Sequence, residues 1–172
     1  TTQRKQYLTI LILTTSIIVI DQIIKIFVKT HLLIGQSIPV FGNWFQILFV
    51  ENEGMAFGMK FGGFTGKLIL SLFRILAATG VMWYLISLVR KNQCSTGMLI
   101  SLSLIFSGAL GNLIDCAFYG LIFNDDFYQV AQLFPPEGGY APFLHGRVVD
   151  MFYFPIIDTT LPSWLPLVGG NH

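Results

Sequence analysis

The stretch LTILILTTSIIVIDQIIKIFV, residues 8–28, decides the fold. Apolar residues fill it almost throughout, and its length matches the ~20 residues that an α-helix needs to cross a bilayer. Arg4 and Lys5 precede it, as positive residues precede the core of a secretory signal peptide. The apolar run is too long for such a peptide, and no pair of small residues marks a cleavage site after it. We therefore expect a retained membrane helix.

Two further apolar segments, about residues 68–89 and 98–118, have similar lengths. The whole chain is 53% hydrophobic and 11% charged, with a mean hydropathy of +0.68. A soluble domain carries about 25% charged residues, so this chain has too little polar material to cover a soluble surface. The expected fold is a membrane all-α helical bundle of three visible spans, forming a single integral membrane domain over residues 1–172.

The charged residues predict an orientation. Arg4 and Lys5 precede the first span, and Arg90 and Lys91 lie between the second and third. The positive-inside rule places these loops and the N-terminus in the cytoplasm. All nine acidic residues would then lie at or beyond the outer ends of the spans. The net charge of +1, without a basic run, gives no support for nucleic-acid binding.

Two segments, about residues 29–66 and 119–172, are then outside. The first contains FQILFVENEGMAFGMKF, which is rich in β-branched and aromatic residues and is broken by turn residues, so we expect a short sheet or hairpin at the membrane surface. The second contains Pro-Pro and Gly-Gly pairs and indicates an ordered loop. Its aromatic residues within 119–145 suggest a lid or a segment that lies on the interface.

Polar residues inside the spans are costly and suggest function. Asp21 and Lys25 are four apart, so they share one helix face; the alternative is a snorkelling pair near the outer interface. In SGALGNLID, residues 107–115, small residues at the third span would let another helix approach closely. Asn112 and Asp115 share a face there; the alternative is a packing hydrogen bond and an interfacial cap.

Two outer stretches are ambiguous on local evidence. HGRVVDMFYFP, residues 145–155, puts Asp150 in an apolar run, as a β-edge with one solvated residue would. VENEGMAFG, residues 50–58, has the composition of a turn. No Cys/His pair has metal-ligand spacing. Cys94 and Cys116 would lie about 33 Å apart across one helix, too far for a disulfide.

Four blocks occur together in one order: DQIIK at 21–25, ENEGMAFG at 51–58, GALGNLID at 108–115 and GRVVDMFYF at 146–154. In this topology the combination resembles the lipoprotein signal peptidase (signal peptidase II) family. The resemblance implies an aspartyl endopeptidase of the bacterial cytoplasmic membrane with four helices and a small outer β-cradle. It would cleave prolipoproteins before a diacylglyceryl-modified cysteine, with no metal or cofactor. The expected partners are this lipid-modified substrate and membrane lipid, and we expect a monomer.

The resemblance carries roles onto individual residues. Asp150 matches the first of two catalytic aspartates. The remaining matches would bind substrate or support the site: Asp21, Lys25, Asn52, Gly54, Gly108, Asn112, Asp115 and Arg147.

The sequence departs from the family pattern in three places. Cys116 stands where the family has Arg, with Arg147 as the candidate replacement, and Met55 stands where Ala is usual. The block Asn-x-x-Asp with the second catalytic aspartate is missing, since Asp158 lacks the Asn and no span follows it. We therefore expect the second aspartate and a fourth helix beyond His172.

Two alternative functions stay open at this point. One is a catalytically inactive three-span homologue that binds lipidated signal peptides. The other is a small transporter or assembly subunit, in which Asp21, Lys25 and Asp115 would form a buried polar relay.

Overall fold

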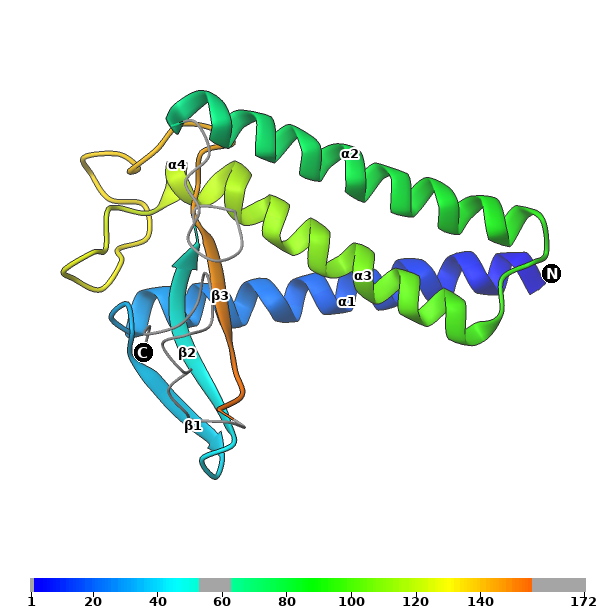
Figure 1. Cartoon of the computed structure of the whole chain (residues 1–172), viewed down its shortest axis with the longest axis horizontal. Coiled ribbons are helices and arrows are strands. Elements are labelled where there is room, and N and C mark those ends of the chain that lie inside the picture. Colours follow the sequence, from blue (N-terminus) through cyan, green and yellow to red (C-terminus); the bar gives the residue numbers. More distant parts are fainter. Residues whose placement is uncertain (1, 53–62, 156–172) are drawn as a thin grey trace, which may run out of the picture.

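The computed structural model describes residues 2–52 and 63–155. Three long helices lie side by side in Figure 1: α1 (Thr2–His31), α2 (Gly63–Arg90) and α3 (Thr96–Ile114). A π-helical turn and a short helix continue the third: η2 (Asp115–Tyr119) and α4 (Gly120–Ile122). α3 begins at an N-cap, where the Ser95 hydroxyl accepts a hydrogen bond of 3.3 Å from the Met98 N–H.

By length and composition, three helices in the described part of the chain could cross a membrane: Thr2–His31, Gly63–Arg90 and Thr96–Ile122. Large apolar side chains cover their outward faces; Leu76 and Trp83 of α2, for example, are each 70% exposed. A soluble protein would bury such side chains, whereas lipid solvates them. The helices contain the expected ranges 8–28, 68–89 and 98–118.

α1 and α3 approach closely at Gly111. A Cβ atom on this residue would lie 2.5 Å from a carboxylate oxygen of Asp21, so only glycine fits without a shift. This agrees with the prediction that small residues of the third span allow close helix packing. Gly108, which was expected to support the site, has no heavy atom within 4 Å of its Cβ position. The close contact is therefore made by Gly111 and not by Gly108, whose supporting role stays a prediction.

A three-stranded antiparallel sheet projects from one end of the bundle, beside α1 (Figure 1). We call this end of the bundle the sheet end. Its order is β1 (Ser37–Phe41), β2 (Phe45–Asn52) and β3 (Val148–Tyr153). The expected fold class, apolar helices with a small sheet, is confirmed. β3 comes from the far end of the described chain and lies at the edge of the sheet, as the stretch around Asp150 suggested.

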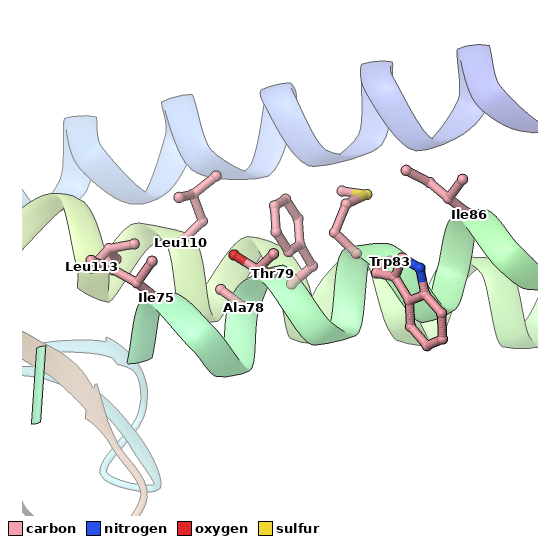
Figure 2. A pocket seen from close by; sticks show the side chains of 9 residues that line it. Ile75, Ala78, Thr79, Trp83, Ile86, Leu110 and Leu113 are labelled. Carbon is pink, nitrogen blue, oxygen red and sulfur yellow. The ribbon is translucent and has the colours of Figure 1, made fainter. Parts of the chain in front are cut away.

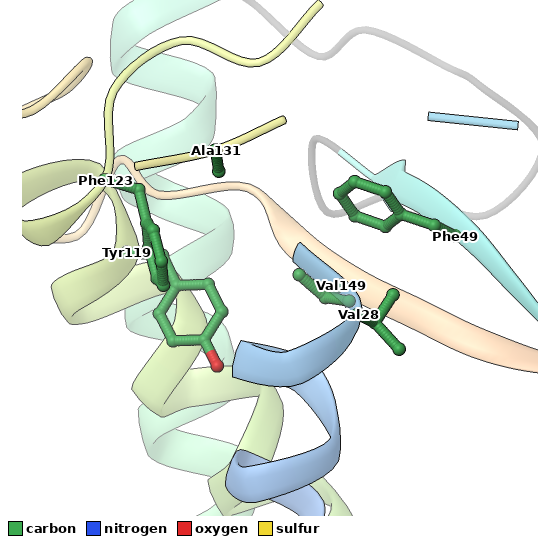
Figure 3. Packing of buried hydrophobic residues seen from close by; sticks show 6 residues of the cluster. All are labelled: Val28, Phe49, Tyr119, Phe123, Ala131 and Val149. Carbon is green, nitrogen blue, oxygen red and sulfur yellow. The ribbon is translucent and has the colours of Figure 1, made fainter. Parts of the chain in front are cut away.

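A hydrophobic cluster attaches the sheet to the helices. Figure 3 shows its members, which come from α1, β2, η2, β3 and the loop after α4: Val28, Phe49, Tyr119, Phe123, Ala131 and Val149. Each is at most 5% exposed. This cluster fixes the sheet at the helix ends, so the strand that carries Asp150 has a defined position.

Residues 123–147 form a long connection from α4 to β3, which backbone hydrogen bonds hold at several points. The Tyr140 N–H donates to the Phe123 carbonyl at 3.0 Å, and the Gly146 N–H to the Cys116 carbonyl at 2.8 Å. A Cβ on Gly146 would overlap the backbone of Asp115, which explains the glycine. The segment is an ordered part of the fold, and its role as a lid stays a prediction.

α2 and α3 enclose an apolar groove of about 400 Å³. Figure 2 shows Ile75, Thr79 and Ile86 of α2 and Leu110 and Leu113 of α3 around it. Its lining is apolar apart from Thr79, so it offers no catalytic group.

Candidate functional site

Lys25 is the centre of a buried polar cluster between α1 and α3. Its ammonium lies 2.7 Å from Asp115 Oδ2, 3.0 Å from Asn112 Oδ1 and 3.2 Å from Asp21 Oδ2. The Lys25 side chain is 3% exposed and that of Asp115 is 0% exposed. A snorkelling lysine would reach water instead, so that alternative is wrong. The face with Asp21 and Lys25 and the face with Asn112 and Asp115 were each predicted. In the structure these two faces meet and form one interhelical cluster.

Two further side chains complete the interhelical cluster. The Gln22 amide donates to Asp115 Oδ1 at 3.0 Å and to the Gly111 carbonyl at 3.3 Å. The Tyr119 hydroxyl donates to the side-chain Oε1 of Gln22 at 3.1 Å. Both Asp115 oxygens therefore have donors, as a buried carboxylate requires. Gln22 was visible in DQIIK, but its role needed the spatial neighbours.

Asp115 also holds the sheet. The Val149 N–H donates to Asp115 Oδ2 at 3.2 Å, and the next residue along β3 is Asp150. α3 changes into the π-helical turn η2 at Asp115. Such turns occur frequently at functional sites. A continuous chain of contacts thus runs from Lys25 through Asp115 to the backbone beside Asp150.

Asp150 lies on the face of the sheet opposite Val149, and it is exposed there. In the β2–β3 ladder, Val50 pairs with Asp150 and Asn52 with Val148. Residues two apart on a strand share a face, so Asn52 is a diagonal neighbour of Asp150 on that face, at a typical spacing of about 7–8 Å. Asp150 is exposed, whereas the alternate residue Val149 is in the core. The structure therefore brings together two residues that the sequence predicted for the site. Gly54, Met55 and Asp158 lie outside the described residues.

The structure corrects the expectation for Arg147. The cation beside Cys116 is Arg74 of α2, whose Nη1 lies 2.8 Å from the Cys116 Sγ. Arg147 lies elsewhere, in ion pairs with Glu51 and Asp125 at 2.7 and 2.8 Å. Arg74 was visible as a charge inside the second span, but sequence spacing could not show its partner.

Sequence reasoning missed a second buried cluster at the sheet end, the sheet-end ion cluster: Lys29, Glu51, Asp126 and Arg147. Lys29 contacts the Glu51 carboxylate and lies 2.5 Å from Asp126 Oδ2. Lys29 follows Lys25 by four residues, so the helix face of Asp21 and Lys25 could have identified it. Glu51 belongs to strand β2, so its interpretation as a turn residue is wrong.

Burial raises the pKa of the Glu51 carboxyl above its ordinary value, although Lys29 and Arg147 oppose this shift. Burial likewise raises the pKa of the Tyr140 hydroxyl, which accepts a hydrogen bond from the Arg147 N–H. Among residues 2–52 and 63–155, no group of three His, Cys, Asp or Glu side chains is arranged to hold a metal. Cys94 and Cys116 are both free thiols.

The fold and site define a class: a multispan membrane protein with a buried polar cluster that holds a carboxylate-bearing edge strand at the helix ends. Residues 13–166 match the family model described as signal peptidase (SPase) II. The chain belongs to the signal peptidase II family.

Individual relatives agree with this family. The chain is 54% identical over 156 residues to a lipoprotein signal peptidase of Porphyromonas gingivalis, covering 91% of this chain and 67% of the relative. It is 35% identical over 157 residues to the one of Amoebophilus asiaticus, covering 90% and 63%. A bacterial membrane enzyme solved in meso at 1.9 Å resolution has a TM-score of 0.56 at 25% identity, covering 86% of this chain and 75% of that one. The chain thus spans about two thirds of the length of these curated relatives.

Proposed function

We propose that this chain carries the activity of its family, the removal of signal peptides from prolipoproteins, and that Asp150 is a catalytic carboxylate. One observation supports this assignment above others: Asp150 is exposed on the same sheet face as Asn52, while the buried Asp115 ties its strand to the spans. Cleavage falls just before a cysteine that already carries a diacylglyceryl group.

The chemistry needs a pair of acids. Two neighbouring carboxylates cannot both ionise cheaply, so they share a proton. The ionised member takes a proton from water, and the protonated member polarises the scissile carbonyl. Asp150 is one of this pair. The other belongs to an Asn-x-x-Asp block in the family and is not assigned to a described residue. This reaction uses no metal or cofactor.

The position of Asp150 suits a lipid-anchored substrate. Its strand passes Asp115, where α3 gives way to η2 in the part of the bundle that carries the sheet, so the carboxylate lies near the sheet end of the spans. The acyl chains of a substrate can stay in the bilayer while the peptide reaches the sheet. With the positive-inside rule, this end of the bundle faces outward from the bacterial cytoplasmic membrane and the N-terminus faces the cytoplasm. The enzyme acts as a monomer.

Four of the supporting residues bind the substrate or hold the strand that carries Asp150. Asn52 contacts the substrate peptide from β2, as does Gly54 just beyond that strand. Lys25 neutralises Asp115, which in turn holds the Val149 amide. The interhelical cluster thus ends on a strand backbone, which favours a structural tie over the polar relay of a transporter subunit.

The test is a cleavage assay with the full-length protein in detergent. Diacylglyceryl-modified prolipoprotein should be cut at the bond before the modified cysteine, and mass spectrometry of both products locates that bond. The unmodified prolipoprotein is the matched control and should stay intact. Equal cleavage of both forms, or cleavage of neither, would contradict the proposed function.

A further inference from the structure

We propose that the sheet-end ion cluster sets the register of β2 against β3 and thereby positions Asp150 against Asn52. Its four members, Lys29, Glu51, Asp126 and Arg147, are then positioning residues for the hydrolysis. The inference rests on the proposed function for its catalytic consequence, but the register itself can be measured separately.

The cluster joins three parts of the chain. Lys29 is in the last turn of α1, Glu51 is in β2, and Asp126 and Arg147 lie near the two ends of the 123–147 segment. The side chains of Lys29, Glu51, Asp126 and Arg147 are 0%, 3%, 0% and 7% exposed. Ionised groups are buried this deeply only when they are paired, so these three parts are held together by charge.

The placement of the cluster beside the site is what gives it a role. Glu51 directly precedes Asn52 and its backbone pairs with Val149; Arg147 directly precedes Val148, which pairs with Asn52. Arg147 Nη1 lies 2.7 Å from Glu51 Oε2, a charge contact without full hydrogen-bond alignment. This contact cross-links the two strands at the end that carries the candidate site.

The β2–β3 ladder alone does not set the register at Asp150. Its register is interrupted between Ile47 and Val50, so pairing farther along the strands does not dictate the pairing at Asp150. A slip by one residue would turn every side chain of the strand to the other face. Asp150 would then point toward the core and Val149 toward the substrate face.

Arg147 makes further contacts besides its ion pair with Glu51. Its guanidinium lies 4.4 Å from the Phe127 ring centroid and 4.2 Å from that of Tyr140. Its Nη2 lies 2.8 Å from Asp125 Oδ1 at the rim of the cluster. A planar guanidinium can stack on aromatic rings while its fixed fork of N–H groups pairs with carboxylates, a geometry that a lysine ammonium does not reproduce. The 123–147 segment therefore supplies the groups that hold Arg147.

The first experiment measures register without activity. Asn52→Cys with Val148→Cys places two thiols on paired residues, where facing Cβ atoms are about 4.5–5.5 Å apart. In the full-length protein, mild oxidation should cross-link this pair. Adding Arg147→Lys should slow the cross-linking about tenfold or more, the factor that a population shift of about 1.4 kcal/mol produces at 25 °C. Equal cross-linking rates with and without the Arg147→Lys substitution would overturn the inference.

The second experiment measures catalysis in the full-length protein with native Asn52. Arg147→Lys should lower kcat by up to about 100-fold, as expected for a misplaced catalytic group, and should move the limbs of the pH profile of kcat. The pH limbs do not depend on how much protein is folded, so a merely structural loss would leave them unchanged. Lys91→Met, an exposed cation far from the site, is the control and should leave both unchanged.

The outcomes separate the two proposals. A wild-type protein that cleaves no prolipoprotein contradicts the proposed function, while the cross-linking result still decides the register. A wild-type protein that cleaves, together with an Arg147→Lys variant of unchanged pH profile and kcat, overturns only the positioning role. If Arg147→Lys yields too little folded protein, Glu51→Gln replaces it, since this variant breaks the same cross-link and keeps the side-chain shape.

Discussion

Removing the ammonium of Lys25 should destabilise the protein far more than loss of a surface lysine. Its three polar contacts lie within 3.2 Å, to Asp115, Asn112 and Asp21. Lys25→Met keeps the apolar stem and leaves Asp115 as a buried, uncompensated carboxylate. Breaking a buried ion pair in this way costs about 3–5 kcal/mol.

The lower end of that range applies here. After the substitution, the Gln22 amide and the Val149 N–H still donate to Asp115, so the carboxylate is not left without donors. We therefore expect Lys25→Met to lower the free energy of unfolding by about 3 kcal/mol. Adding Asp115→Asn removes the uncompensated carboxylate charge and should recover part of the lost free energy of unfolding.

The assay is equilibrium unfolding of the full-length protein in mixed detergent micelles, followed by tryptophan fluorescence. Lys91→Met, which removes an exposed lysine at the opposite end of the bundle, is the matched control and should change stability by less than about 0.5 kcal/mol. A loss below about 1 kcal/mol for Lys25→Met, the size of an exposed pair, would refute the reasoning. So would a double variant that is less stable than the single one.

Three further substitutions test other parts of the account. Gly111→Ala should cost about 1–3 kcal/mol, because the added methyl group overlaps the Asp21 carboxylate and displaces it from the interhelical cluster. Gly108→Ala has open space and should not destabilise the protein in the same unfolding assay. Equal losses of stability for the two variants would contradict the packing. Phe49→Ala, at a fully buried position, should cost about 3–5 kcal/mol, and Phe134→Ala, at a 71% exposed one, close to none; a reversed order would contradict the described core. Because burial raises the pKa of Glu51 above its ordinary value of 4.5, the folded state keeps that proton to higher pH than the unfolded state, so its contribution to stability is largest below pH 4.5 and declines as the pH rises toward the folded-state pKa. Glu51→Gln should flatten that decline in unfolding measured from about pH 4 to 7, and an unchanged slope would show that the group does not titrate there.

The helices could be predicted from the sequence because membrane spans are selected by length and hydropathy alone. The sequence could also predict that Lys25 shares a helix face with Asp21, and Asp115 with Asn112, because helical periodicity is a local property. The sheet register that places Asn52 beside Asp150 joins segments about 100 residues apart, which no local pattern contains.

The sheet-end ion cluster could not be predicted from the sequence either, because its members lie far apart along the chain. Lys29 lies on the face of Lys25 and could have been found, but Asp126 and Glu51 are ordinary acidic residues until folding brings them to Lys29. Arg147, the expected replacement for the family's cation beside Cys116, lies in the sheet-end ion cluster instead. The structure fills that place with Arg74 from α2, since a guanidinium on a neighbouring span can reach the thiol.

The central claim is that the carboxylate of Asp150 performs the chemistry. The most direct measurement is the single-turnover rate of diacylglyceryl prolipoprotein cleavage by the full-length Asp150→Asn variant. Glu137→Gln, which makes the same change at an exposed acid of the 123–147 segment, is its control. The account predicts that Asp150→Asn lowers the cleavage rate by about 10²- to 10⁴-fold, the scale of a lost acid–base group, while Glu137→Gln cleaves at the wild-type rate. Cleavage by the folded Asp150→Asn protein at the wild-type rate would contradict the account.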